Sequence, residues 1–158
     1  MTTYQIAEEL CNRLAEFFIV HKYCATTTNS VYIKLDYGVA NSIRVSDHNG
    51  IEKYKYKYNI RKDIDEKYEE VDDNYLRKYY PFKDIGDLIL DVIVDREMKK
   101  VSIGKEQYYK QMEEKKIQSE SATNSFWRYC TKLKRGKEYE SKEAIIGEDE
   151  SQYYLDNS

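Results

Sequence analysis

Residues 29–50 read NSVYIKLDYGVANSIRVSDHNG, and this stretch decides the fold. Apolar and polar residues alternate on both sides of the DYG sequence at 36–38. A period of two is typical of strands that bury one face, and Asp and Gly favour the turn between two such strands. The stretch therefore predicts two short antiparallel strands whose inward-facing residues are Val31, Ile33 and Leu35, then Ile43 and Val45.

A third strand is predicted at 53–58, where the sequence KYKYKY places tyrosines on one face and lysines on the other. The Asn49-Gly50 pair that follows His48 favours a tight hairpin between the second and third strands. A fourth strand over residues 22–27 would extend the same ribbon. The sequence thus predicts a three- to four-stranded antiparallel meander.

Helical periodicity surrounds this ribbon. Residues 3–20 carry apolar side chains at helical spacing after a capping box of Thr2 and Gln5. A central helix is expected from Ile85 to about Lys100, with Asp84 as its cap, and further helices around Tyr108 and after Asn124. For residues 61–80 a surface loop and a short covering helix both remain open. The predicted class is α+β: an N-terminal helix, the antiparallel meander and a helical C-terminal half.

Composition favours one domain over residues 1–135 and a disordered acidic tail over 136–158. The 158 residues suffice for one core, and the apolar residues thin out after Gly136 while acidic ones accumulate. Three widely spaced cysteines favour buried, reduced thiols over disulfides. The N-terminus is acidic where a signal peptide would be basic, and no apolar run has the length of a membrane span. We therefore expect a location in the cytoplasm.

The first candidate binding cluster lies on the second strand and its turn. Arg44 shares a strand face with Ser42 and Ser46, and Asp47 and His48 follow it. A guanidinium group in this position can bind a phosphate or carboxylate in a two-pronged manner. The alternative is structural: Asp47 and His48 would close the hairpin through side-chain to backbone hydrogen bonds, and Arg44 would pair with a nearby carboxylate.

The second candidate cluster belongs to the predicted last helix. Basic residues follow Trp127 there, and they could hold a phosphate or complement the C-terminus of the helix. The candidates of this cluster are Trp127, Arg128, Lys132 and Arg135.

Catalysis is not expected from this sequence. Two histidines, three isolated cysteines and scattered carboxylates match no spacing for a nucleophile, a metal site or a phosphate-binding glycine loop. The prediction is a protein without catalytic residues, metal or cofactor. An enzyme of nucleotide processing would instead require a metal or turnover that depends on His48.

Two motifs carry a family resemblance: NSVYIKL at 29–35 with NSIRVSDH at 41–48, and the helical pattern from Ile85 to Met112 that includes Gly104 and Tyr108. Over residues 1–115 the chain resembles small accessory proteins encoded by phages and prophages of low-GC bacteria. The resemblance implies a phage context and transfers no catalytic signature. Small non-enzymatic phage proteins often neutralise host defence, as anti-CRISPR proteins and proteins that sequester immune signalling nucleotides do.

Two hypotheses about function follow. The first is a non-enzymatic phage anti-defence protein that binds a host immune component, either a CRISPR-type nuclease or a signalling nucleotide. The alternative is a nucleic-acid-binding accessory protein of phage replication or transcription. The net charge of −3 favours neither hypothesis, because it is too close to neutral to indicate a polyanionic partner.

Overall fold

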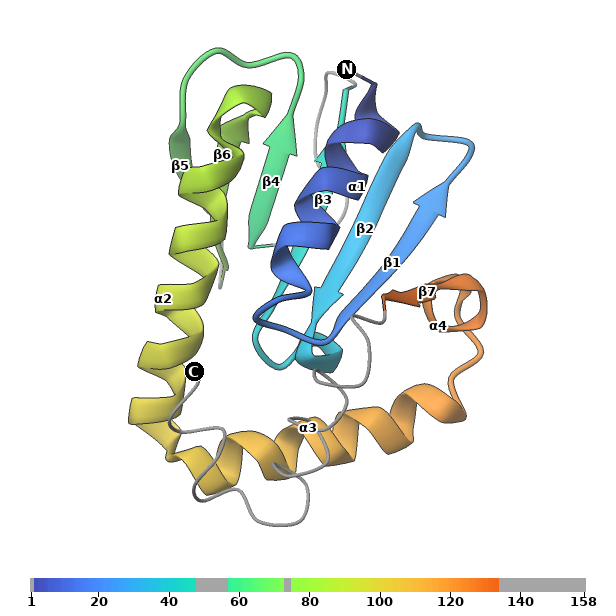
Figure 1. Cartoon of the computed structure of the whole chain (residues 1–158), viewed down its shortest axis with the longest axis vertical. Coiled ribbons are helices and arrows are strands. Elements are labelled where there is room, and N and C mark those ends of the chain that lie inside the picture. The colour runs from blue at the N-terminus through green and yellow to red at the C-terminus, as the bar shows by residue number, and fades with distance from the viewer. Residues whose placement is uncertain (1, 48–56, 73–74, 134–158) are drawn as a thin grey trace.

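The computed structural model describes residues 2–47, 57–72 and 75–133. Seven strands of this part form one mixed sheet in the order β5-β6-β4-β3-β2-β1-β7 (Figure 1). The strands are β1 (Val20–Ala25), β2 (Ser30–Leu35), β3 (Asn41–Ser46), β4 (Tyr58–Arg61), β5 (Tyr68–Asp72), β6 (Tyr75–Pro81) and β7 (Thr131–Leu133). The α+β class is confirmed, but the sheet is larger than the predicted ribbon and is not purely antiparallel.

The antiparallel meander is confirmed only in part: it consists of β1, β2 and β3, and the third strand predicted at 53–58 does not belong to it. Ile33 lies opposite Ile43 and Tyr32 lies opposite Arg44, so the inward and outward faces follow the alternation of the sequence. The strand expected over 22–27 is β1, which pairs with β2. The 3-10 helix η1 (Asp36–Gly38) makes the turn between β2 and β3.

Asn49-Gly50 lies outside the described residues, but the next described strand, β4, runs parallel to β3 and not antiparallel as predicted. A two-residue turn cannot join parallel strands. β4 lies in the middle of the sheet with β6 parallel on its other side, and all four of its residues are buried. Burial on both faces is typical of parallel strands. Of the KYKYKY sequence, residues 53–56 lie outside the described residues, and Tyr58 belongs to β4.

Residues 61–80 contain the hairpin of β5 and β6 rather than a loop or helix. Opposite charges face each other in its register, with Glu69 opposite Lys78 and Glu70 opposite Arg77. Cross-strand pairs of this kind stabilise antiparallel strands that lack apolar alternation. The high charge of this segment therefore reflects pairing between two strands.

The described helices are α1 (Thr3–Leu14), α2 (Ile85–Ile103), α3 (Lys105–Glu120), α4 (Ser125–Tyr129) and the 3-10 helix η2 (Phe82–Asp84). The capping box of α1 is confirmed: the Gln5 amide donates to Thr2 Oγ1 at 3.1 Å and the Thr2 amide donates to Gln5 Oε1 at 2.8 Å. Asp84 occupies the N-cap position of α2 without a side-chain capping hydrogen bond. α1 ends at Leu14, so Phe17 is 42% exposed and does not continue its apolar stripe.

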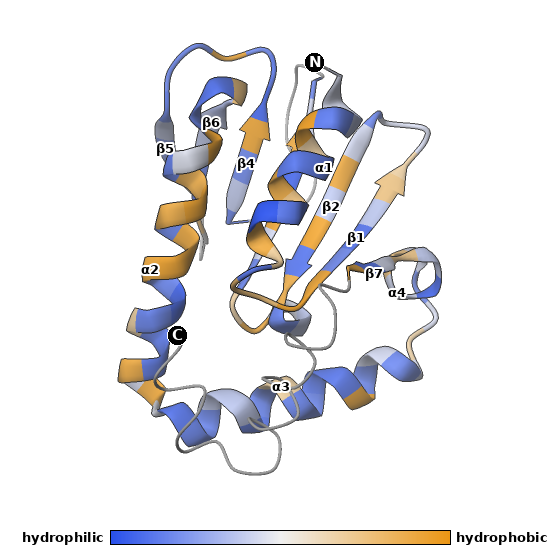
Figure 2. Cartoon of the chain, viewed as in Figure 1, coloured by the Kyte–Doolittle hydropathy of each residue, from blue (hydrophilic) through white to orange (hydrophobic). Residues whose placement is uncertain are grey.

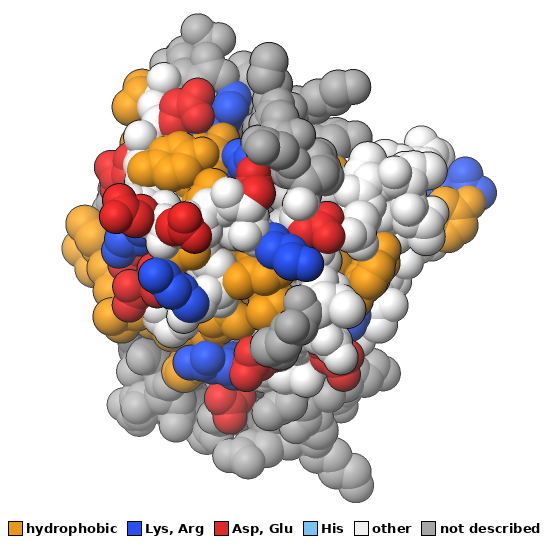
Figure 3. Space-filling model, turned by 90° about the horizontal axis from the view of Figure 1, so that it is seen from above, with side chains coloured by type: hydrophobic (Ala, Val, Ile, Leu, Met, Phe, Trp, Pro, Cys, Tyr) orange, Lys and Arg blue, Asp and Glu red, His pale blue; other side chains and the backbone are white. Residues whose placement is uncertain are grey.

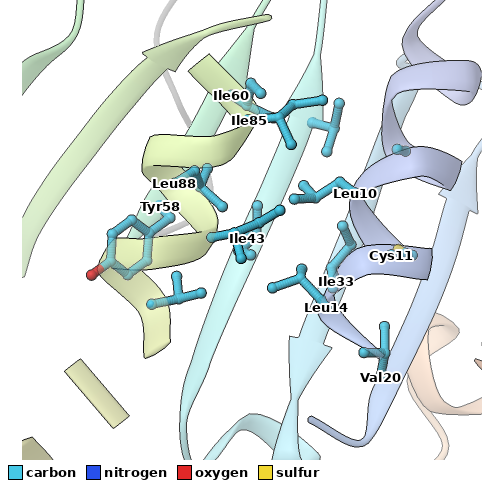
Figure 4. Packing of buried hydrophobic residues seen from close by; sticks show 14 of the residues in the cluster. Leu10, Cys11, Leu14, Val20, Ile33, Ile43, Tyr58, Ile60, Ile85 and Leu88 are labelled. Carbon is cyan, nitrogen blue, oxygen red and sulfur yellow. The ribbon is translucent and has the colours of Figure 1, made fainter. Parts of the chain in front are cut away.

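The main core lies between one face of the sheet and the pair α1 and α2. Leu10 and Leu14 of α1 and Leu88 of α2 point toward Ile33 and Ile43 of the strands (Figure 4). Apolar residues of both helices and of the central strands appear as orange bands in Figure 2. The central packing role predicted for the helix after Pro81 is thereby confirmed.

The end of the described chain differs from the predicted last helix. Asn124 caps α4 as expected, since its Oδ1 accepts a hydrogen bond from the Trp127 amide at 3.1 Å. The helix stops at Tyr129 because Cys130 adopts an extended conformation, and β7 then pairs with β1. Lys132 therefore lies on a strand, and Leu133 packs against the main core.

Two further predictions concern single residues and termini. Of the three free cysteines, Cys11 is buried and Cys130 is half-buried, whereas Cys24 is exposed at the end of β1, so the expected burial is wrong for Cys24.

The acidic segment 136–158 lies outside the described residues. None of the described helices combines the length and the apolar character needed to cross a membrane.

Candidate functional site

A pocket of about 320 Å³ opens beside the sheet face that α1 and α2 leave uncovered. Its walls come from β2, η1 and the start of β3 on one side and from α3 and α4 on the other. We call it the lysine–tryptophan pocket. Its described lining residues are Lys34, Tyr37, Gly38, Ser42, Lys115, Gln118, Ser119, Ala122, Asn124 and Trp127.

Strand register places the sheet side of the pocket. Ile33 and Ile43 face α1, so their neighbours Lys34 and Ser42, which pair with each other, face the opposite side. The same row continues through His21 of β1 to Lys132 of β7. Three neighbouring strands thus carry a lysine, a histidine and a second lysine along one line that ends at the pocket.

Aromatic rings form one wall of the pocket. Trp127 and Tyr37 stack with ring centroids 6.3 Å apart and planes at 25°. His21 lies behind them, with its ring centroid 5.0 Å from that of Tyr37 and 5.2 Å from that of Trp127. Lys34 Nζ is 5.9 Å from the Trp127 ring centroid and 5.2 Å from that of Phe126. The wall therefore offers a flat aromatic surface next to an ammonium group.

The electrostatics of the pocket are positive. Burial lowers the pKa of Lys34, and the nearby Lys115 lowers it further. Burial, and then Lys132, lower the pKa of His21 to about 4, so its imidazole is neutral at physiological pH. The described lining holds two lysines and no carboxylate. An anion placed between the lysines would relieve their mutual repulsion.

A conformationally restricted turn presents Tyr37 to the pocket. Asp36, Tyr37 and Gly38 have φ of 51°, 60° and 91°, three consecutive residues in a region that disfavours side chains. Asp36 holds this turn from beneath, because its Oδ1 accepts the Ile19 amide at 2.9 Å and its Oδ2 accepts the Tyr108 hydroxyl at 2.6 Å. Burial raises the pKa of this carboxyl group.

Arg44 of the first predicted cluster lies on the same sheet face as Lys34, but not in the pocket lining. Arg44 is 5% exposed, and its Nε and Nη2 donate to Ser30 Oγ at 3.3 and 3.1 Å. Asp47 accepts a hydrogen bond of 2.7 Å from Asn29, which ties the end of β3 to the turn before β2. Both contacts are structural, but neither is the carboxylate pairing of Arg44 or the side-chain to backbone bond of Asp47 that the structural alternative describes. His48 lies outside the described residues.

The second predicted cluster is partly brought to the pocket. Trp127 lines it, and Lys132 Nζ lies 6.0 Å from the Tyr37 ring centroid. Arg128 is exposed, with its guanidinium carbon 5.4 Å from the ring centroid of Tyr129. Arg135 lies outside the described residues.

Sequence reasoning missed the central residues of the pocket. The alternation that buries Ile33 also assigns Lys34 to the other face, so a pairing of Lys34 with Ser42 could have been found from the strand register. Lys115 has no such signal, because it is one of several charged residues on the polar surface of α3.

Searches of protein-family models, curated proteins and solved structures find no match to this chain. Function is therefore inferred from the residues of the pocket and their surroundings.

Proposed function

We propose that this protein is a non-enzymatic binding protein that holds a phosphate-bearing nucleotide in the lysine–tryptophan pocket. In the phage context that the sequence resemblance implies, it acts as an anti-defence protein by sequestering a signalling nucleotide of host immunity. The observation that carries this proposal is the meeting of Lys34, Lys115 and the Trp127 ring in one pocket without a lining carboxylate among the described residues.

Each part of a nucleotide has a matching group. Lysine ammonium groups are common phosphate ligands, and stacking of a base on an aromatic ring contributes about 1–3 kcal/mol. The hydroxyl groups of Ser42 and Ser119 and the amides of Gln118 and Asn124 can bond to the sugar or to the base edge. A volume of about 320 Å³ falls at the lower end of the usual range for small-molecule sites.

The chemistry of the lining favours binding over turnover. Its polar groups are ammonium, hydroxyl and amide groups, which position a ligand but are poor proton acceptors at neutral pH. The neighbouring imidazole of His21 is 7% exposed and lies behind the aromatic wall. A concave site of this size also favours a small ligand over a nuclease surface as the immune component.

Nucleic-acid binding is the second candidate, and a specific arrangement favours it. Tyr23 and Tyr32 stack at 6.4 Å on the same sheet face, next to the row that contains Lys34 and Lys132. Tyr23 is half-buried, so part of its ring faces solvent. A single strand could leave the pocket and follow these rings, as in proteins that stack successive bases on aromatic side chains.

Trp127 provides a direct assay because it is the only tryptophan of the chain. We would titrate linear and cyclic nucleotides and single-stranded oligonucleotides of increasing length, and follow Trp127 fluorescence and binding heat. Saturable binding of a small nucleotide, recovered unchanged afterwards, is expected. Affinity that rises with oligonucleotide length and falls steeply with salt would favour the alternative.

Matched lysine variants test the site itself. Lys34→Gln and Lys115→Gln should each weaken nucleotide binding about tenfold, as expected for the loss of a charge-assisted hydrogen bond. Lys116→Gln is the control, since Lys116 is the next exposed residue of α3 but does not line the pocket. Equal losses in Lys115→Gln and Lys116→Gln, or no binding of any nucleotide, would contradict the proposal.

A further inference from the structure

A row of exposed apolar side chains runs along the outer side of α2. Leu90, Val94, Met98 and Val101 are 60%, 45%, 64% and 85% exposed. Their spacing of three and four residues places them on one side of the helix over about 16 Å. We call this row the α2 stripe. The inward side of α2 already fills the core, so the stripe is a second apolar surface.

Two more exposed apolar side chains lie on the β5 and β6 strands. Val71 and Leu76 face each other across β5 and β6 and are 77% and 37% exposed. Leu76 points to the same sheet face as Tyr80, whose hydroxyl bonds to Asp91 of α2. On the flank where α2 lies, hydrophobic side chains reach the surface between charged ones (Figure 3). The four stripe side chains adjoin one another along α2, and a contiguous exposed apolar patch marks an interaction site.

The stripe is complementary to an antiparallel copy of itself. Its middle lies between Asp95 and Arg96, and rotation about that point brings Leu90 toward Val101 and Val94 toward Met98. Antiparallel packing also sets opposite ends of the two helix dipoles side by side.

Charge supports the same orientation. Asp87 continues the line of the stripe at its N-terminal end; its side chain is 61% exposed and lies 3.9 Å from Lys67 Nζ of its own chain, a long ion pair that leaves the carboxylate facing solvent. In the antiparallel pair it approaches the region of Lys105 of the other copy, just beyond the C-terminal end of α2. A parallel pair would instead set Asp87 against Asp87.

We propose that the α2 stripe is the interface of a homodimer in which two copies of α2 pack antiparallel about a two-fold axis. Pairing through the edge strand β5 is disfavoured, because Glu69 and Glu70 would bring like charges together. Stable dimers usually bury about 800 Å² on each partner. The stripe with Val71 and Leu76 is a small surface, so the dimer should be reversible. The lysine–tryptophan pocket does not include this surface, so the dimer does not depend on the proposed function.

Molar mass measured by light scattering across a wide range of protein concentrations tests the dimer. The wild-type protein should approach twice the chain mass of 18.9 kDa as concentration rises. Val94→Glu should keep the single-chain mass throughout while its circular dichroism stays unchanged. Ile117→Glu is the matched control, because Ile117 is 59% exposed on α3 and should leave the dimer intact. A wild-type monomer at all concentrations, or a dimer that Val94→Glu leaves intact, would overturn the proposal.

Disulfide cross-linking tests the orientation in a Cys24→Ser background. The double variant Leu90→Cys/Val101→Cys should form covalent dimers on mild oxidation. The two positions are about 16 Å apart within one helix, too far for a disulfide inside one chain. Leu90→Cys alone should form no covalent dimer, because the antiparallel pair keeps the two copies of position 90 apart. Efficient cross-linking of Leu90→Cys alone would indicate parallel helices and overturn the proposed arrangement.

Discussion

The hydroxyl group of Tyr108 on α3 donates a hydrogen bond of 2.6 Å to Oδ2 of the buried Asp36 carboxyl group in η1. Arg96 and Lys100 of α2 lie close enough to lower the pKa of the same carboxyl group, although burial outweighs them. Asp36 thus connects two helices to the turn that presents Tyr37. Buried contacts of Asp36 therefore hold the turn whose Tyr37 and Gly38 line the lysine–tryptophan pocket.

Removing the Tyr108 hydroxyl group should destabilise the protein. Tyr108→Phe keeps the ring but leaves a buried acceptor without this donor, which costs about 1–3 kcal/mol in the free energy of unfolding. Urea denaturation followed by circular dichroism measures the loss. Tyr129→Phe is the control, because Tyr129 is 63% exposed and its hydroxyl group is accessible to water. Equal stability of the two variants would refute a stabilising role for this contact.

The glycines of η1 and α2 should respond in opposite directions to the same substitution. Gly38 has φ of 91°, so Gly38→Ala should lower the free energy of unfolding by about 1–2 kcal/mol. Gly86 lies in the first turn of α2, and an added Cβ would meet Arg13 Nη2 only at 3.9 Å. Gly86→Ala should therefore raise the free energy of unfolding by about 0.5 kcal/mol. Thermal and urea unfolding of both variants decide the point, and a neutral Gly38→Ala would show that the turn is not restricted.

The part of the fold that the sequence predicts is the part that local rules govern. The capping box of Thr2 and Gln5 and the alternation around Ile33 and Ile43 depend on neighbours a few residues away, and both are found as expected. The parallel pairing of β3 with β4 depends on which distant strand lies beside which. No local signal around Tyr58 distinguishes a parallel neighbour from an antiparallel one.

The hairpin of β5 and β6 and the pocket were missed for related reasons. Glu69 and Glu70 suggest a solvated loop until their partners, Lys78 and Arg77, are seen opposite them. Likewise, Trp127 was expected on a long basic helix, whereas the short α4 turns its ring toward Tyr37 and Lys34. In both cases the sequence shows the side chains themselves, but their contact partners are set by the tertiary structure.

Acid should destabilise the fold through His21. Its folded-state pKa of about 4 lies below the ordinary 6.5, so the unfolded chain takes up the proton first as pH falls. The contribution of neutral His21 to the free energy of unfolding is fully present above pH 6.5. It declines as the pH falls toward 4, by about 3 kcal/mol at most. Urea denaturation at a series of pH values should show a shallower acid decline for His21→Phe than for wild type. The NMR titration of His21, assigned with His48→Gln, should have its midpoint near 4, and a midpoint near 6.5 would disprove the effect.

Replacing Lys115 by glutamate should separate stability from binding in the proposed pocket. In the free protein burial lowers the pKa of Lys34 and repulsion from Lys115 lowers it further, so Lys115→Glu exchanges a repulsion for an attraction. The free energy of unfolding should rise by about 0.2–1 kcal/mol, the usual range for an exposed ion pair. Nucleotide affinity should fall by more than the tenfold expected for Lys115→Gln, because a carboxylate now faces the phosphate. Lys116→Glu should show neither effect, since that side chain does not line the pocket. If Lys115 served only to stabilise the fold, Lys115→Glu would instead lower the free energy of unfolding. Calorimetric unfolding and Trp127 fluorescence titration together distinguish the two roles.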